Sequence, residues 1–584
     1  MFGTERLLAR TFFARLFESE LMPPGLPQVQ LVIGSLSMMA APGFIVAFEV
    51  QRRYAYLWRT SPERLRDAIL ADQLLFVTYS MMAVGLVALV IWEGVFPDRR
   101  DVRTLGVLPL RTRTHVIARL AALAAVAALF SAGANIMSAV VYGNVLWSYG
   151  AAAGPVRAIA AHLIGTGLAG LCVFFTLVTA QGVLLNAFGR RQAQQLALAL
   201  QLLFVVVLLQ ALMFVPSLAV VMRAGFRGEP DTFAAFLPPT WFVALYNVIA
   251  GTPGGAPGRH ALGALAATLG SMLMAATLLA LSYPRLVRMA LEAPDRRSPP
   301  RTGTRLVWAD RFWRANLRPV RSAVARFTLR TVMRSRTHLI LLAIYTGIGF
   351  ALVVATLVPF LVARGASAIW TPHTALLSAP LIVNFWMLCG LRVLFGIPSE
   401  IRANWALRLY APDDQIAEAV RGVRMAMLLL VVVPVALAAG AAGLALWGLR
   451  VGAVHAVFTG AAGVLLVDLL VIRLRKIPFT CTYHPGRSRA RFLWPLYVAA
   501  FAAYAFGLAG LEAIAIDRWV ALLAALFAIA ALDSGLAILR KRDLQAPPGL
   551  TYAEEDPEAL FAGFRLSEGI AAETMPSARA AAPR

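Results

Sequence analysis

Lysine is almost absent from this chain, which has two, Lys476 and Lys541, among 584 residues. Both follow an arginine, and neither follows a glycine. A P-loop needs the pattern G-x-x-x-x-G-K-[ST], because its backbone amides and its lysine hold the nucleotide phosphates. The chain is therefore not itself a P-loop ATPase, and any ATP and Mg²⁺ chemistry that drives it must lie on another polypeptide.

Cysteine and clustered histidine are also scarce. Three cysteines (Cys172, Cys389 and Cys481) lie far apart, which excludes a disulfide framework and a zinc knuckle. The seven histidines are scattered, and the metalloprotease pattern H-E-x-x-H is missing. The first 22 residues are amphipathic and lack the short apolar core and cleavage site of a signal peptide. We therefore predict no catalytic, cofactor-binding or metal-binding residues in this chain.

Charged residues make up only 14% of the chain, against 59% hydrophobic residues and a mean hydropathy of +0.71. A soluble domain cannot bury so much apolar surface, and apolar runs of about 20 residues favour helices over membrane strands. We predict an all-α polytopic membrane protein of about twelve transmembrane helices. The predicted spans are 28–48, 73–95, 116–142, 158–187, 195–221, 261–284, 339–362, 374–395, 423–448, 452–472, 493–514 and 518–539.

The formal charge of +24 comes from arginines that border the apolar runs and do not form one continuous patch. This distribution follows the positive-inside rule and argues against a nucleic-acid partner. Arginine clusters recur in alternate loops, so we predict that both termini are cytoplasmic. The segment 49–71 does not fit, because it carries five arginines in a predicted external loop. Either this segment is an interfacial helix or the first predicted span is wrong. The arginine-rich, lysine-poor composition is typical of GC-rich bacterial genomes and indicates a bacterial cytoplasmic (inner) membrane.

The chain divides into two similar halves. Each half opens with an amphipathic stretch: Leu8, Phe12 and Leu16 form an apolar stripe in the first, and Val320, Val324 and Phe327 do so in the second. Such helices lie in the membrane interface, with their arginines reaching the headgroups. We predict a first half (1–290), a linker (291–317), a second half (318–542) and a cytoplasmic, largely disordered tail (543–584).

Two turns occupy equivalent places in these halves. VFPDRRDVRTLGVLPLRTRTHVIARL follows the second span, and GIPSEIRANWALRLYAPDDQIAEAVRGVR follows the eighth. In each turn a proline comes directly after the span and a second proline follows 12 or 14 residues later. Prolines at these places frame a short cytoplasmic helix. The simpler interpretation is a pair of basic loops, which any transporter has.

This layout resembles the permease subunits of ABC-2-type exporters. The resemblance rests on an amphipathic entry helix, two spans and a turn of the type PDRRDVRTLGVLPLRTRTHVIARL, together with LPPTWFVALYNVIAG at 237–251. It implies that the turns 96–115 and 396–422 are coupling helices that dock on a separate ABC ATPase, expected as a dimer, and that the chain exports an unknown substrate. The residues expected to make this contact are Asp98, Arg99, Arg100, Asp101, Arg103, Glu400, Arg402, Asn404 and Trp405. Trp405 equally fits a place at the lipid headgroups.

Two acids, Asp468 and Asp533, lie within predicted spans, and ionisable groups in lipid indicate function by default. They either pair with a nearby arginine such as Arg473, lie near the cytoplasmic interface, or carry protons. The third option gives the alternative function, a proton-coupled 12-span transporter of the major-facilitator type. GVFPDRRDV (94–102) has the Gly and Asp-Arg of that class's motif, but Asp101 where a glycine is expected. A scaffold or a lipid-modifying membrane protein is a third class that the sequence leaves open.

Overall fold

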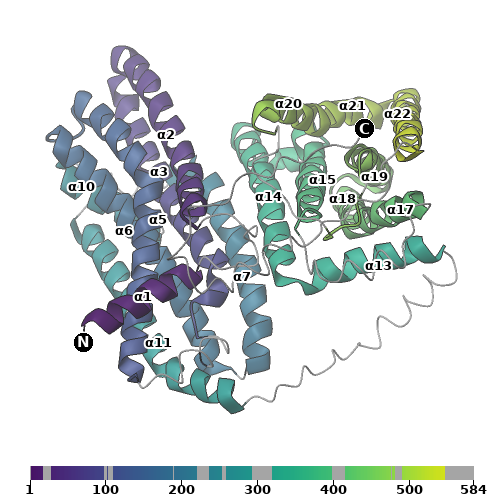
Figure 1. Ribbon diagram of the computed structural model, residues 1–584. Helices are drawn as coiled ribbons and strands as arrows, with labels where there is room; N and C mark the ends of the chain where they lie inside the picture. Colours follow the sequence, from purple (N-terminus) through teal and green to yellow (C-terminus); the bar gives the residue numbers. More distant parts are fainter. Residues whose placement is uncertain are drawn as a thin grey trace, which may run out of the picture.

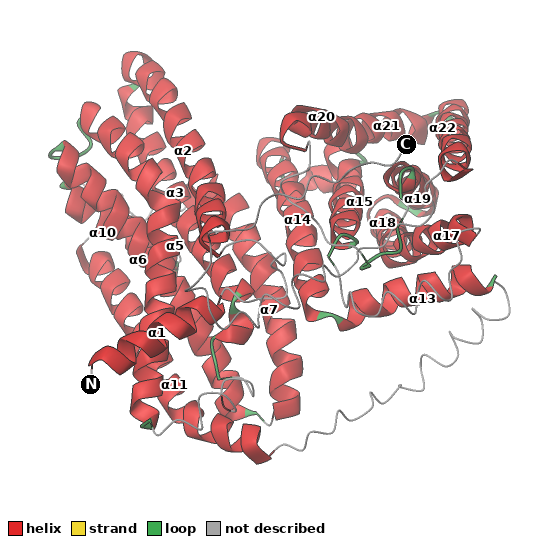
Figure 2. Cartoon of the chain, viewed as in Figure 1, coloured by secondary structure: helices red, strands yellow, loops and turns green. Residues whose placement is uncertain are grey.

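The protein is built from helices throughout the part of the chain that its structure, a computed structural model, describes. Long helices dominate these ranges and no strand occurs in them (Figure 2). Twelve of these helices are long and apolar enough to cross a membrane, the number predicted from the sequence. The described residues are 2–16, 28–97, 102, 110–188, 190–216, 218–219, 236–252, 258–292, 318–397, 415–474, 476–480 and 490–545. The protein is therefore an all-α polytopic membrane protein.

Figure 1 shows the helices in two groups, which meet where α7 and α14 lie side by side. The first group is α1 (Phe2–Leu16), α2 (Gln28–Thr60), α3 (Pro62–Val90), α5 (Thr112–Ser148), α6 (Pro155–Ala187), α7 (Arg190–Met213), α10 (Pro238–Ala250) and α11 (Gly258–Glu292). The second group is α13 (Pro319–Arg334), α14 (Arg336–Arg364), α15 (Thr374–Leu394), α17 (Ile416–Met427), α18 (Val433–Trp447), α19 (Leu449–Val471), α20 (Ala490–Ala502), α21 (Leu508–Asp517) and α22 (Trp519–Gln545). A π-helical turn, Leu428–Val432, joins α17 and α18 into one span.

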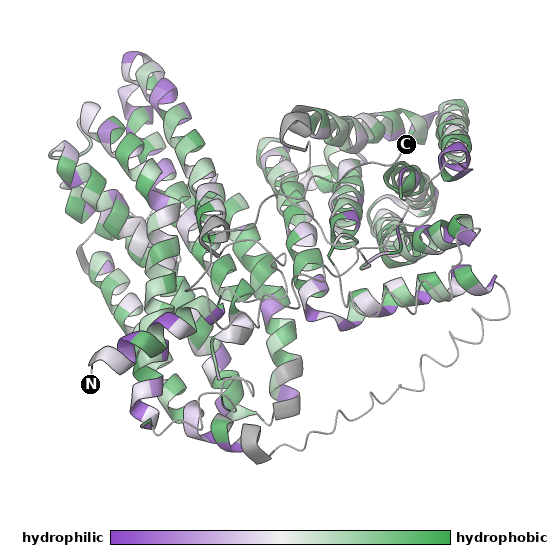
Figure 3. Ribbon diagram, in the orientation of Figure 1, coloured by the Kyte–Doolittle hydropathy of each residue, from purple (hydrophilic) through white to green (hydrophobic). Residues whose placement is uncertain are grey.

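The segment 49–71 is helical on both sides of Ser61, so the prediction of a loop there is wrong, whereas its external side stays a prediction. The helix α2 continues to Thr60, and α3 begins at Pro62 after the single residue Ser61. A helix of 33 residues is roughly 50 Å long, whereas the hydrocarbon core of a bilayer is roughly 30 Å thick. The arginine-rich end of this hairpin therefore projects beyond the bilayer, where Figure 3 shows hydrophilic residues.

The two groups share a packing pattern. In the first, α6 lies among α3, α5, α10 and α11; in the second, α19 lies among α15, α18, α21 and α22. The short helix α1 packs on α5 and α13 packs on α17, so each amphipathic helix contacts the helix that follows a predicted turn. The helices α3 and α15 both end on one side of the molecule, which we call the turn side. The opposite side is called the far side.

The amphipathic helices form as predicted, but their apolar stripes face the protein interior and not the lipid. Leu8, Phe12 and Leu16 are buried in one core cluster with residues of α3 and α5. Val324 is buried in the corresponding cluster of the second group, with Val320 and Phe327 packed against it. Burial of these stripes joins both helices firmly to the spans beside them.

The predicted linker and the predicted tail lie mostly outside the described residues. Only the first two residues of the predicted linker 291–317 are described, at the end of α11. The same holds for the predicted tail, of which the structure describes 543–545, the end of α22.

Candidate functional site

The residues predicted to contact an ATPase lie outside the described residues. This applies to the whole predicted set, which is Asp98, Arg99, Arg100, Asp101, Arg103, Glu400, Arg402, Asn404 and Trp405. The structure does describe the residues at which both turns leave and re-enter the helices. These anchor points show how each turn is attached to the rest of the molecule.

Arg119 holds the start of the first turn. This buried side chain of α5 donates from Nη2 to the carbonyl oxygen of Gly94 at 2.6 Å and to that of Phe96 at 3.0 Å. Its Nε donates to the carbonyl oxygen of Val95 at 2.9 Å. These three carbonyls belong to residues just beyond α3, and backbone carbonyls buried there need hydrogen-bond donors. One guanidinium therefore ties the exit of α3 to the entry of α5.

The helix α1 closes over the same point. The guanidinium of Arg119 lies 5.0 Å from the centroid of the Phe12 ring, within the range of a cation–π contact. A Cβ on Gly94 would lie 2.9 Å from Leu16, so glycine allows the end of α1 to lie directly on the start of the turn. Gln181 of α6 adds a further bond, from Nε2 to the carbonyl oxygen of Trp92 at 2.8 Å.

The start of the second turn is held by different residues. His338 of α14 contacts the carbonyl oxygen of Ile397 through Nε2 at 3.2 Å. The backbone N–H of Phe479 donates to the carbonyl oxygen of Phe395 at 3.2 Å, and the two rings pack edge to face. Phe479 has a positive φ of 67°, unusual for a bulky residue. The chain after α19 therefore folds back against the exit of α15.

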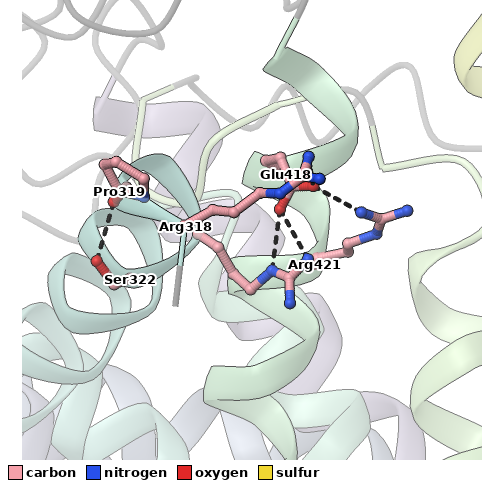
Figure 4. Close-up of polar contacts among 6 residues, drawn as sticks. Arg318, Pro319, Ser322, Glu418 and Arg421 are labelled. Carbon is pink, nitrogen blue, oxygen red and sulfur yellow. Dashed lines mark hydrogen bonds and ion pairs between the residues drawn. The ribbon is translucent and has the colours of Figure 1, made fainter. Parts of the chain in front are cut away.

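Glu418 joins the end of the second predicted turn to the amphipathic helix beside it (Figure 4). Its carboxylate, in the first turn of α17, accepts from Arg318 Nη1 at 3.1 Å and from Arg321 Nε at 2.9 Å. Arg421, one turn along α17, donates to it at 2.6 Å. A Cβ on Gly422 would lie 2.6 Å from the carbonyl oxygen of Arg321, so glycine is required for this close approach of α17 to α13.

Asp468 is paired on the turn side of α19. Arg424 of α17 binds its two carboxylate oxygens at 2.7 Å each, and Arg540 of α22 donates to it as well. Asp533 of α22 lies beside this group and interacts with the same charges. The prediction that Asp468 pairs with an arginine is confirmed, but its partners are Arg424 and Arg540 and not Arg473.

Gln201 links the two groups of helices on the turn side. Its Nε2 donates to the carbonyl oxygen of Leu89, near the end of α3, at 2.6 Å. Its Oε1 accepts from Nη2 of Arg336, the first residue of α14, at 2.7 Å. A further bond across α7 and α14 runs from Gln210 Nε2 to the carbonyl oxygen of Gly347 at 3.4 Å.

A buried polar cluster lies toward the far side of the first group, and the sequence reasoning did not single it out. Asp72 accepts from Tyr54 at 2.8 Å and from Arg53. Beside it, His162 contacts Ser138 Oγ at 3.0 Å and Tyr246 OH at 3.3 Å. The cluster continues through three more residues: Asn135 donates to Ser80 Oγ, which donates to the carbonyl oxygen of Thr166.

The same sequence pattern recurs at equivalent places in the two groups. HLIGTGLAG (162–170) in α6 and HAVFTGAAG (455–463) in α19 share the pattern H-x-x-x-T-G-x-A-G, six or seven residues after the helix begins. Both histidines are buried. His455 contacts Glu512 Oε1 of α21 through Nδ1 at 2.6 Å, and Glu512 is fully buried. A comparison of the halves beyond their turns could have found this repeat.

Within the described residues, histidine, cysteine and acidic side chains form no group of three or more that could hold a metal ion. Comparison with known proteins gives no further assignment. No family model, no curated protein and no solved structure matches the chain.

Proposed function

We propose that this chain is the membrane-spanning permease of an ATP-driven exporter, with the turns 96–115 and 396–422 acting as coupling helices for a separate ATPase. In this proposal both turns and both termini face the cytoplasm of a bacterial cell. ATP binding and hydrolysis occur on the partner, and this chain converts the resulting movement into rearrangement of its helices. The two groups of helices together supply one complete membrane unit.

The observation that carries the proposal is the anchoring of both turns. A coupling segment transmits movement only if its ends are fixed to the elements that must move. Arg119 fixes the first turn to α3 and α5, and the charge cluster around Glu418 fixes the end of the second turn to α13. An ordinary connecting loop needs no such attachment, since loops normally run free over the surface.

The alternative is a proton-coupled transporter that uses Asp468 or Asp533, and the geometry is unfavourable to Asp468 in that role. A proton carrier must release its charge partners when it takes up a proton. Asp468 is bound by two arginines, and both lie on helices other than its own. Breaking two buried ion pairs in each cycle is a large energetic demand, since removing one partner of a buried pair typically costs about 3–5 kcal/mol.

The test is co-purification of the chain, in mild detergent, from cells in which it is native. We expect a P-loop ATPase to accompany it and the complex to hydrolyse ATP. Changing Arg99, Arg100, Glu400 and Arg402 to alanine should release the ATPase, because these side chains are the predicted contacts. This variant loses three positive charges and one negative charge, a net change of −2.

The matched control is Arg59→Ala with Arg64→Ala, which has the same net change of −2. Both arginines are exposed on the far-side hairpin, so the ATPase should be retained. If both variants lost the ATPase, the loss would be explained by the change in net charge alone. That result would contradict the coupling role. No ATPase with any variant, and transport that collapses with the proton gradient, would favour the secondary transporter.

A further inference from the structure

The repeated pattern has different surroundings in the two groups of helices. In the first group, Thr166 Oγ1 donates to the carbonyl oxygen of His162 at 2.6 Å. In the second, Thr459 stands at the same position of the pattern and is fully buried, but its Oγ1 has no hydrogen-bond partner among the described residues. The histidines differ as well, because His162 has neutral partners and His455 is bound to the carboxylate of Glu512.

Unpartnered polar atoms collect along one face of α19. His455, Thr459 and Gly463 are spaced one helical turn apart, so they share that face. Asn384 of α15 lies against Gly463, because a Cβ on this glycine would be 3.2 Å from the Asn384 amide nitrogen. Both side-chain polar atoms of Asn384, the hydroxyl of Thr459 and Oε2 of Glu512 have no partner within the described part of the chain.

The counterpart cluster in the first group is almost fully paired. Ser80, Ser138, His162, Thr166 and Tyr246 each make hydrogen bonds there, and Oδ1 of Asn135 is the one buried polar atom of this cluster that lacks a partner among the described residues. Burial does not separate the two clusters, since Thr166 and Thr459 are both fully buried. The two clusters differ in how many of their buried polar atoms have hydrogen-bond partners.

The second cluster therefore needs something that donates and accepts hydrogen bonds. A buried polar atom without a partner is strongly destabilising, and four of them together represent a loss comparable to the net stability of a typical protein. Buried polar groups without protein partners are commonly satisfied by internal water or by a polar ligand. The lipid chains of a bilayer cannot donate or accept hydrogen bonds, so they cannot replace water or a polar ligand here.

We propose that the second half contains a hydrated site between α15, α19 and α21, bounded by Glu512, Thr459 and Asn384, which admits water and small hydrophilic cations. Its counterpart around His162 is dry and closed. Cations are favoured over anions because Oε2 of the Glu512 carboxylate has no partner among the described residues, its Oε1 being in contact with His455, whereas Thr459 and Asn384 contribute neutral groups. This proposal is independent of the proposed function, because it holds whether an ATPase or a proton gradient drives the protein.

Cysteine labelling tests this proposal on the full-length chain in native membranes. In a background in which Cys172, Cys389 and Cys481 are alanine, one variant carries Thr459→Cys and a matched variant carries Thr166→Cys. The probes are a cationic, membrane-impermeant methanethiosulfonate and its anionic sulfonate analogue. Labelling in SDS afterwards counts the cysteines that are present, and gel filtration verifies that each variant remains folded.

We expect the cationic probe to label the Thr459→Cys variant and to leave the Thr166→Cys variant unlabelled. The cationic-to-anionic labelling ratio should exceed the ratio that the same two probes give with a free thiol in solution by about tenfold, the factor that a modest charge interaction produces. Adding Glu512→Gln should remove this preference. If Thr459→Cys does not fold, Asn384→Cys with Ser80→Cys provides the same comparison, since both native side chains are fully buried.

Each of three results would overturn the proposal. Protection of both cysteines would mean that the second cluster is as dry as the first. Equal labelling of both would mean that the whole protein opens and that the halves do not differ. A preference for the anionic probe would mean that Glu512 does not set the charge selectivity of the site.

Discussion

Asp468 provides the sharpest test of how the second group of helices is held together. Its carboxylate is almost completely buried, and Arg424 and Arg540 bring the two positive charges against it. The exposed fractions of the two arginine side chains are 29% and 16%, so solvent screens these pairs only in part. The change Asp468→Asn keeps the shape of the side chain and removes its charge.

The expected loss follows from this geometry. Removing one partner of a buried ion pair leaves an uncompensated charge and typically costs about 3–5 kcal/mol. The asparagine oxygen still accepts one hydrogen bond, Asp533 remains beside the two arginines and the arginines are partly hydrated, so we expect a decrease in the free energy of unfolding of about 2–4 kcal/mol. Arg424→Gln should cost less, about 1–3 kcal/mol, because Arg540 continues to balance Asp468.

The assay is equilibrium unfolding in mixed micelles, in which an unfolding detergent is titrated into a mild one. The double variant Asp468→Asn with Arg424→Gln completes a cycle, and the two changes should be less than additive by at least about 1 kcal/mol. Glu49→Gln is the control, since the Glu49–Arg52 pair is highly exposed and 3.9 Å apart. We expect no measurable change from it.

Two results would refute the reasoning. If Asp468→Asn were as stable as the Glu49→Gln control, the pair would not hold α19 to its neighbours. If the effects of the two substitutions were simply additive, Asp468 and Arg424 would act independently, contrary to their bidentate contact.

Three further predictions follow from packing and hydrogen bonding. Arg119→Gln should lower the free energy of unfolding by about 2–4 kcal/mol, because it removes three bonds to carbonyl oxygens, and hydrogen exchange should speed up at the end of α3. Gly452→Ala should destabilise the protein by at least about 2 kcal/mol in the same unfolding assay, because its Cβ would meet the backbone of α18 at 2.4 Å, whereas Gly460→Ala has room and should be close to neutral. Gln201→Ala should loosen the contact of α7 with α14, seen as faster cross-linking of cysteines placed along that interface, and an unchanged rate would show that the bond to Arg336 does not hold it.

The number of spans could be predicted from the sequence because apolar length alone decides whether a segment crosses a bilayer. The residues at which the spans end could not be predicted in this way. The segment 49–71 is predicted to be a loop because it lies between two predicted spans, yet α2 runs on to Thr60 and α3 begins at Pro62. Charge at a helix end and charge in a loop look alike in a sequence, because both lie outside the hydrocarbon core.

The partners of polar groups were harder to predict than the groups themselves. Asp468 was identified from its place in an apolar run, but its partners are 44 and 72 residues away in the chain. Such pairs depend on which helices lie side by side, and no local pattern contains that information. Glu512 was missed because a single acid near a helix end is unremarkable until the histidine that faces it is known.

The repeated segments in α6 and α19 lie within one polypeptide, and this has a consequence for how such a protein can change over generations. In an assembly of two identical subunits every substitution appears twice, so a position that must stay dry on one side must stay dry on both. A single chain is free of that symmetry. The two halves can therefore differ, and they do: the histidine of the repeated pattern faces Tyr246 in the first group and Glu512 in the second.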